Sequence, residues 1–268
     1  MRLSEAPRWI RQLGWRTTIE GYVGQAARRA TGRLNDRVGA PALDELRELA
    51  GGRFDLSTEA VLAHFGITMP AALARELAEV ARQLERRFQQ TNRHPAEWRV
   101  EAETGSLLYA LVRTQQPEVV VETGVAAGTS AFVILEALAR NDRGRLHSFD
   151  VDTEVGELVT DRSRWSLTIL PQSKPQAALR AALGTIGGID LFLHDGDHEY
   201  PGQLFDLRLG WRHLGAGGFL VCDDADDSRA FQHFCAETPA VESPSVLFDH
   251  IKLVGVASKH VTGTSNCW

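Results

Sequence analysis

The feature that most constrains the fold of this chain is an apolar run that stops at a glycine and continues as a helical pattern. Residues 119–121 are consecutive valines, which suit a strand buried on both faces of a sheet. Gly124 and Gly128 then allow a turn in which the backbone approaches a ligand closely. Thr129 or Ser130 is placed to cap the helix that follows. Strand, glycine turn and helix in this order predict a ligand-binding turn in an α/β domain.

The chain beyond this turn alternates strand and helix patterns. A helix is predicted over residues 131–140. The predicted strands that follow it are residues 145–150, 167–170, 189–194 and 219–222, with two more at 246–248 and 253–257. Such alternation predicts a parallel sheet covered by helices on both faces. Ligands of these sheets lie beyond the carboxyl ends of the strands, near the point where the strand order reverses.

Two helices are predicted before the first strand. Apolar residues within 71–90 recur at steps of three and four, which places them on one stripe: Leu73, Leu77, Val80, Leu84 and Phe88. This stripe suits packing on the rest of the protein and a dimer seam equally. A second helix, over residues 101–114, directly precedes the first strand. We therefore divide the chain into a helical N-terminal extension, residues 1–100, and a ligand-binding domain, residues 101–268.

The composition indicates a globular protein that is soluble in a reducing cytoplasm. Hydrophobic residues make up 43% of the chain, charged residues 24%, and the net charge of −6 disfavours nucleic-acid binding. No apolar run approaches the roughly 20 residues of a membrane span. The three cysteines have neither paired nor metal-ligand spacing. Residues 1–33 contain seven arginines, which we interpret as solvated helix faces rather than as contacts with an anionic substrate or membrane surface.

The glycine spacing helps to identify the ligand. A dinucleotide-binding turn would have glycines at 124, 126 and 129, but this chain has Ala126 and Thr129. The NAD interpretation is therefore weakened. Glu122, at the end of the first strand, would be badly placed beneath a pyrophosphate and well placed beneath an ammonium group. S-adenosylmethionine carries such a group.

Acidic residues follow two further predicted strands. Asp195 and His198 come after the strand at 189–194, and Asp223 and Asp224 come after the next one. Since the carboxyl ends of neighbouring parallel strands meet at one edge of a sheet, the three carboxylates can converge. Carboxylate oxygens with room for water molecules suit Mg²⁺. The sequence therefore predicts a metal site at this edge.

These acidic residues also have structural interpretations. Asp224 can cap the helix that follows it, and His198 can be a polar residue hydrogen-bonded to an aspartate. Asp197, Asp226 and Asp227 suit an acidic rim around the site, although one of them can replace a metal ligand.

Three motifs resemble those of a known enzyme family. Val-Glu-Thr-Gly-Val-Ala-Ala-Gly resembles motif I of the Rossmann-like S-adenosylmethionine-dependent methyltransferases, with alanine at the middle glycine. Leu-His-Asp-Gly-Asp-His-Glu-Tyr and Gly-Gly-Phe-Leu-Val-Cys-Asp-Asp are similar to motifs of the metal-dependent O-methyltransferases of the catechol type, and more closely to the branch that modifies sugars of macrolides and other natural products. The resemblance covers about residues 101–258.

The resemblance implies a fold and roles for particular residues. The implied fold is a doubly wound, seven-stranded, mostly parallel sheet with an antiparallel C-terminal strand. The implied ligands of Mg²⁺ or another divalent cation are Asp195, Asp223 and Asp224, and the catalytic residues are His198, the general base, and Asp195. Asp150, beyond the second strand, is placed to accept hydrogen bonds from ribose hydroxyls. The full set of expected contacts with S-adenosylmethionine is Glu122, Thr123, Gly124, Gly128, Thr129, Ser130, Asp150, Gln172, Ser173 and Asp195.

The expected activity is methyl transfer from S-adenosylmethionine to a hydroxyl of a small molecule, such as a sugar, a polyketide or a phenolic product. A metal-bound hydroxyl is more easily deprotonated, and a histidine can take its proton. Trp98, Tyr109 and Tyr200 are candidates to line the acceptor pocket, although lone aromatic residues are more often core. The alternatives are a metal-independent O- or N-methyltransferase and a non-catalytic cofactor-binding protein. A homo-oligomer is compatible with the sequence.

Overall fold

A computed structural model describes residues 43–52, 54–90, 93–95, 98–241, 243–249 and 252–259. The arginine-rich residues 1–33 and Cys267 lie outside this part of the chain. Cys222 and Cys235 are buried and free. Among the helices within the described ranges, none is long and apolar enough to cross a membrane.

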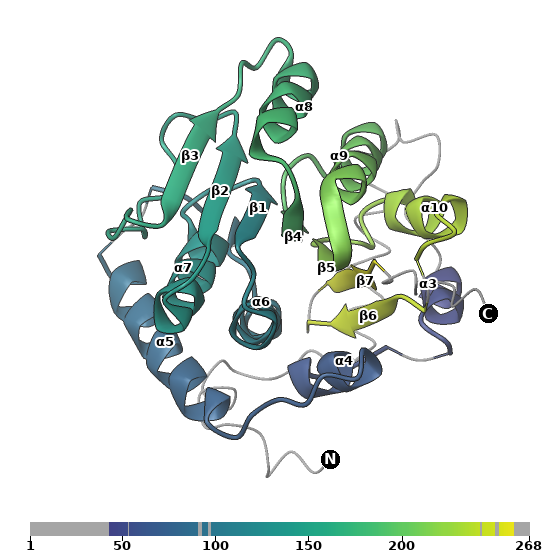
Figure 1. Ribbon diagram of the computed structural model, residues 1–268, viewed down its shortest axis with the longest axis horizontal. Coiled ribbons are helices and arrows are strands. Elements are labelled where there is room, and N and C mark those ends of the chain that lie inside the picture. Colours follow the sequence, from purple (N-terminus) through teal and green to yellow (C-terminus); the bar gives the residue numbers. More distant parts are fainter. Residues whose placement is uncertain are drawn as a thin grey trace, which may run out of the picture.

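The centre of the fold is a seven-stranded sheet with the strand order β3-β2-β1-β4-β5-β7-β6 (Figure 1). The strands are β1 Val119–Thr123, β2 Arg145–Asp150, β3 Trp165–Ile169, β4 Ile189–His194, β5 Leu214–Cys222, β6 Ser245–Phe248 and β7 Leu253–Ser258. Strands β1 to β5 pair in parallel, and β7 is antiparallel to both β5 and β6. This topology confirms the predicted fold class. The strand order reverses between β1 and β4, so a ligand is expected at their carboxyl ends.

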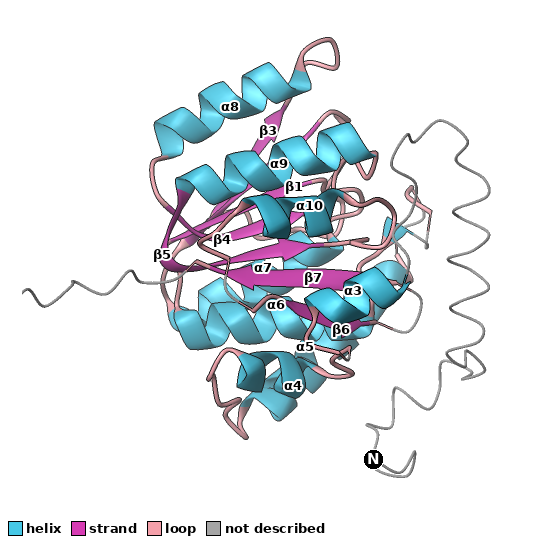
Figure 2. Ribbon diagram, turned by 90° about the vertical axis from the view of Figure 1, so that its right-hand side faces the viewer, coloured by secondary structure: helices cyan, strands magenta, loops and turns pink. Residues whose placement is uncertain are grey.

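Helices cover both faces of the sheet (Figure 2). One face carries α4 (Thr58–His64), α6 (Ala102–Gln115) and α7 (Thr129–Asn141), with α5 (Leu73–Phe88) outside α6 and α7. The other face carries α3 (Leu43–Leu49), α8 (Pro175–Ile186), α9 (Tyr200–His213) and α10 (Ala230–Glu237). Each face has its own apolar cluster, and the valines of β1 contribute to both: Val120 to the first and Val121 to the second. Burial of β1 on both faces explains its unbroken apolar run.

The apolar stripe of α5 packs within the protein. Leu73 and Val80 are buried, and Leu77 and Leu84 are partly buried against the cluster that includes α6 and α7. Of the two interpretations offered by the sequence, the structure therefore supports packing on the rest of the protein for this face.

One prediction about helix starts is wrong, and one structural alternative is excluded. Neither Thr129 nor Ser130 caps α7, because Gly128 holds the cap position and no side chain there bonds to the helix. Gly128 has a φ of +88°, a left-handed backbone conformation that favours glycine and that sets the direction in which α7 leaves the turn. Asp224 does not cap the helix after β5 either, since α10 starts only at Ala230, with Arg229 at its cap position.

Candidate functional site

A cavity of about 990 Å³ opens at the carboxyl edge of β1, β2, β4 and β5. The parallel register places Thr123 beside Phe149 and His194, and His194 beside Cys222, so the residues after these strands meet at one edge. Residues that follow four strands line the cavity, together with residues of three further segments. They are 123–126, 149–152, 195–198, 223–224 and Asp227 after the strands, and 98–99, 173–177 and Lys252, among others. The volume suits a nucleoside-sized ligand with space for a second molecule.

The glycine turn forms one wall of the cavity. Gly124 has a φ of +81°, and a Cβ atom there would lie 1.8 Å from the backbone oxygen of Asp195. Only glycine therefore allows the end of β1 to pass the end of β4 at this distance. Ala126, at the middle position of the motif, adopts a left-handed φ of +44°. The turn is fixed by the Asp150 carboxylate, whose Oδ2 accepts hydrogen bonds from the Val125 N–H at 2.8 Å and the Ala126 N–H at 3.4 Å.

Glu122 lies behind this wall and not in it. Its side chain is fully buried, its Oε2 accepts a 3.5 Å hydrogen bond from the Ser130 hydroxyl, and its Oε1 has no hydrogen-bond partner. Burial, and then the charge of Asp195, raise the pKa of Glu122 well above its usual value. The expected contact between Glu122 and the cofactor's ammonium group stays a prediction.

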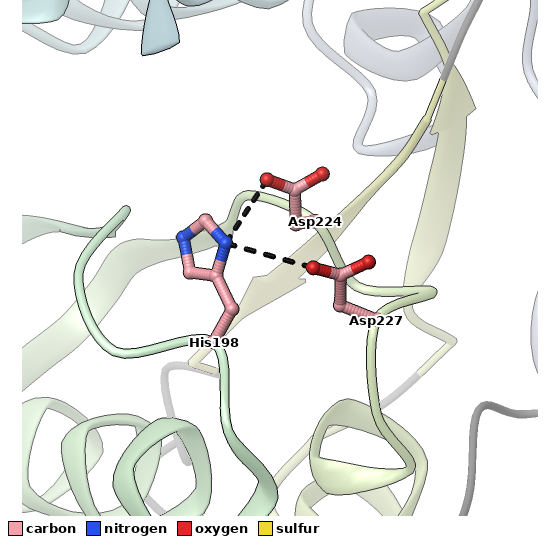
Figure 3. Close-up of side chains that lie close together, drawn as sticks. All are labelled: His198, Asp224 and Asp227. Atoms are coloured by element: carbon pink, nitrogen blue, oxygen red, sulfur yellow. Dashed lines mark ion pairs between the residues drawn. The ribbon is translucent and has the colours of Figure 1, made fainter. Parts of the chain in front are cut away.

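The cavity lining also includes a cluster of carboxylates around His198, of which Figure 3 shows Asp224 and Asp227. The Nδ1 atom of His198 lies 3.1 Å from Asp224 Oδ2 and 3.8 Å from Asp227 Oδ2, and Nε2 lies 3.6 Å from Asp195 Oδ1. Ligand atoms of His198, Asp224 and Asp227 all lie within 4.8 Å of one another, which is close enough to share a metal ion. Asp224 has a left-handed φ of +47°, a conformation that costs backbone energy and is frequent at functional sites.

The carboxylates determine the protonation of His198. Burial lowers the pKa of His198, but hydrogen bonds with Asp195, Asp224 and Asp227 outweigh burial and raise this pKa to about 12. The imidazole is therefore cationic at neutral pH in the protein without ligands. It can act as a base only when a ligand offsets the surrounding negative charge.

A second cation, the ammonium of Lys252, reaches the same cluster. Its Nζ contacts the Asp223 carboxylate, lies 2.7 Å from Glu101 Oε2, and lies 4.0 Å from Asp224 Oδ2. Burial lowers the pKa of Lys252, but Asp223, Asp224 and Glu101 raise it well above its usual value. Asp223 is 1% exposed, and its second oxygen, Oδ1, has no hydrogen-bond partner. The buried carboxylate thus has one oxygen on the ammonium and one available to a ligand.

The cavity brings together most, but not all, of the residues expected from the sequence. Those that line it are Thr123, Gly124, Asp150, Ser173, Asp195, His198, Asp223 and Asp224. Those that are not among its lining residues are Glu122, Gly128, Thr129, Ser130 and Gln172.

The sequence analysis missed Lys252 and Glu101. A signal for Lys252 was available, because it directly precedes a strand that was expected to be antiparallel. The start of such a strand lies beside the carboxyl end of its neighbour, here β5, where Asp223 follows. Glu101 precedes α6 and gives no comparable signal.

The three aromatic candidates have different positions. Trp98 lines the cavity and is 60% exposed, so it is available to an acceptor. Tyr109 is fully buried and donates a hydrogen bond to Glu76. The Tyr200 hydroxyl bonds to the ring of His233 at 2.8 Å and does not line the cavity.

Comparison with known proteins links the central region to one domain family and the fold to solved structures. Residues 121–225 match the family model described as a methyltransferase domain. The O-methyltransferase TomG of Streptomyces achromogenes, in complex with S-adenosylmethionine, is 18% identical, with a TM-score of 0.52 over 69% of this chain and 89% of that one. The methyltransferase PaMTH1 of Podospora anserina, bound to S-adenosylhomocysteine, is 19% identical, with a TM-score of 0.52 over 71% of this chain and 88% of that one.

Among curated sequences, an uncharacterised protein of Acanthamoeba polyphaga mimivirus is 40% identical over 42 residues. This match spans 16% of the present chain and 19% of the viral protein.

Proposed function

Since residues 121–225 carry a methyltransferase domain within a Rossmann-like sheet, we propose that the protein transfers a methyl group from S-adenosylmethionine to a hydroxyl of a small molecule. The observation that carries this proposal is the shared cavity. The glycine turn, Asp150 and the His198 cluster all line it. The proposed acceptors are sugars, polyketides or phenols.

The glycine turn and Asp150 suit the cofactor. The cavity passes Gly124 and reaches Asp150 at the end of β2, where ribose hydroxyls can bond to the carboxylate. Both Asp150 oxygens already accept backbone hydrogen bonds, from Val125 and Ala126 on Oδ2 and from Asp152 on Oδ1. These bonds fix the carboxylate in position, and each oxygen has a further lone pair for a hydroxyl. Ser173 lines the cavity beyond Asp150, on the side proposed for adenine.

The acceptor hydroxyl is proposed to lie against His198. The Nε2 atom lies 3.6 Å from Asp195 Oδ1 and is the nitrogen proposed to receive the hydroxyl proton, once a ligand that offsets the surrounding negative charge has lowered the pKa of the ring. Asp224 and Asp227 both face Nδ1, which orients the ring and stabilises the imidazolium after transfer. Trp98 supplies an exposed aromatic surface for the acceptor body.

The residues present fit a divalent cation. The expected ligands Asp195, Asp223 and Asp224 all line the cavity, and Asp223 Oδ1 is a buried oxygen without a partner. The ligand atoms that lie within 4.8 Å of one another belong to His198, Asp224 and Asp227, so Asp227 is a candidate to replace one of the expected ligands. Hard carboxylate oxygens of this kind suit Mg²⁺. A bound cation would supply Lewis-acid polarisation of the acceptor oxygen. Lys252 favours a second candidate, a metal-independent O-methyltransferase, because its ammonium already balances the charge of Asp223.

The proposal is tested with S-adenosylmethionine that carries a labelled methyl group and a panel of acceptors with hydroxyl or amine groups, with and without Mg²⁺. We expect an O-linked labelled product, and we expect His198→Ala to reduce its formation by about 100-fold or more. His233→Ala, which alters a partly buried histidine outside the cavity, is the matched control and should retain activity. Transfer to amines alone, or full activity of His198→Ala, would contradict the proposal.

A further inference from the structure

Lys252 lies where the fold brings a chain segment back to the carboxylate cluster. It directly precedes β7, which runs antiparallel to β5, and the register pairs Cys222 with Gly255. The first residues of β7 therefore lie beside Asp223. The turn before β7 is held by Asp249, which accepts hydrogen bonds from the Thr104 N–H and hydroxyl at the start of α6. The position of the Lys252 ammonium is thus set by two packed elements.

The ammonium is enclosed by oxygens in the way a bound cation would be. Lys252 is 5% exposed, and its Nζ contacts Asp223, lies 2.7 Å from Glu101 and lies 4.0 Å from Asp224. Lysine is almost never this deeply buried unless it is paired. The sequence has 29 lysines and arginines, of which only Lys174, Lys252 and Lys259 are lysines. Position 252 therefore carries a compact ammonium in a chain whose other basic residues are mostly arginines.

A divalent cation at the expected site would need oxygens of the same two aspartates. Asp223 has one oxygen on the ammonium and one buried oxygen, Oδ1, without a partner. That oxygen offers half of the carboxylate to a metal, while the other half is held by a positive charge. A dication bound to Asp223 and Asp224 would lie within a few ångströms of Nζ, where two positive charges repel strongly in a buried site.

We propose that the Lys252 ammonium and a divalent cation are alternative occupants of the Asp223–Asp224 carboxylates, so that Lys252 sets the metal affinity of the site. Metal binding then requires the ammonium to leave Asp223. In the absence of metal, Lys252 balances the charge of the cluster. This inference rests on the proposed roles of Asp223 and Asp224 as metal ligands, but not on any methyl acceptor.

The test is a calorimetric titration of Mn²⁺ into the purified, chelator-stripped protein, without cofactor or acceptor. Lys252→Met removes the charge and keeps the length of the side chain, and it should bind Mn²⁺ at least about tenfold more tightly than wild type. Lys252→Arg keeps the charge and should show no gain. Lys174→Met is the matched control, since Lys174 is an exposed lysine that lines the same cavity. Equal or weaker Mn²⁺ binding by Lys252→Met, or no binding by either protein, would overturn the inference.

A variant that leaves Asp223 without its partner can fail to fold. In that case the double variant Lys252→Met, Glu101→Gln, which also lacks one carboxylate beside the ammonium, is compared with Glu101→Gln alone. The double variant should bind Mn²⁺ at least about tenfold more tightly.

Acetylation of the wild-type lysines followed by mass spectrometry gives a further readout. Lys252 should be protected relative to Lys174 without metal and should become reactive when Mn²⁺ is bound. Mn²⁺ binding that leaves Lys252 fully protected contradicts the inference. Loss of methyl transfer with these binding results intact would count only against the proposed function.

Discussion

At the scale of single residues, the main feature of the site is that two cationic side chains lie among several carboxylates. His198 contacts Asp195, Asp224 and Asp227, and Lys252 contacts Asp223. Lys252 is buried and His198 is partly buried, so each carboxylate near them strongly affects their protonation. The general base proposed for the reaction is therefore protonated in the resting protein, and its activation depends on what enters the cavity.

The raised pKa of His198 has a consequence for stability that needs no substrate. The pKa is about 12 in the folded protein and about 6.5 in an unfolded chain. A group whose folded pKa is raised contributes its full stability below the unfolded pKa and loses it as the pH rises toward the folded pKa. The contribution of His198 should therefore be largest near pH 6 and smaller at pH 9.

Urea unfolding of wild type and His198→Gln at these two pH values measures this effect. We expect the free energy of unfolding of the variant to fall below that of wild type by more at pH 6 than at pH 9, with a difference of at least about 1 kcal/mol. An equal gap at both pH values would show that the pKa of His198 is not raised in the folded protein. His233→Gln controls for general effects of replacing a histidine.

At the scale of elements, the sequence predicted the central parallel strands, because short strand patterns alternate with helical segments along the chain. The bounds of β2 and β4 agree with those expected, Arg145–Asp150 and Ile189–His194. The first half of β5, from Leu214, was missed, since Gly215, Gly217 and Gly218 resemble a turn. There the pairing with β4 is irregular, with a register shift between Ile189 and Leu191. Tertiary pairing formed a strand that local propensity does not favour.

The sequence predicted those site residues that directly follow the parallel strands. Asp195 and Asp223 come directly after parallel strands, Asp224 follows Asp223, and the topology brings all three to the cavity. The contact of Asp223 with Lys252 was not foreseen, because it depends on the antiparallel return of β7 and on a turn held by α6. The burial of Glu122 was not predicted either. The strand continues to Thr123, so Glu122 lies within β1 and not at its end.

The glycine turn gives a prediction at the element scale. Gly124→Ala places a Cβ against the Asp195 backbone and strains a φ of +81°, so it should destabilise the fold by more than about 2 kcal/mol and weaken cofactor binding. Gly184→Ala is the matched control. It lies within α8, and its new Cβ would have no atom within 4 Å. That change should stabilise the protein by about 0.5–1 kcal/mol, because alanine favours the helix.

Urea unfolding and calorimetric titration of S-adenosylhomocysteine check both glycine variants. Gly124→Ala that retained the stability and the cofactor affinity of wild type would show that the ends of β1 and β4 can separate without loss. The proposed cofactor wall would then need to lie elsewhere in the cavity.

At the scale of the whole molecule, one edge of one sheet holds every proposed functional group. The point where strand order reverses gives the glycine turn, the neighbouring parallel strands give Asp150, Asp195 and Asp223, and the antiparallel return of β7 gives Lys252. Helices on both faces bury the strands and fix these ends relative to one another. The described helices before the first strand pack on this same layered structure.

The most direct test of the central claim, a cofactor cavity at this edge, is calorimetric titration of S-adenosylhomocysteine into the wild-type protein. We expect one site per chain with a dissociation constant on the order of 10 μM, equivalent to about 7 kcal/mol. The Gly184→Ala variant should bind equally well, and Gly124→Ala should bind at least about tenfold more weakly. Absence of binding to a folded wild-type protein would contradict the account, because the glycine turn and Asp150 would then have no cofactor to hold.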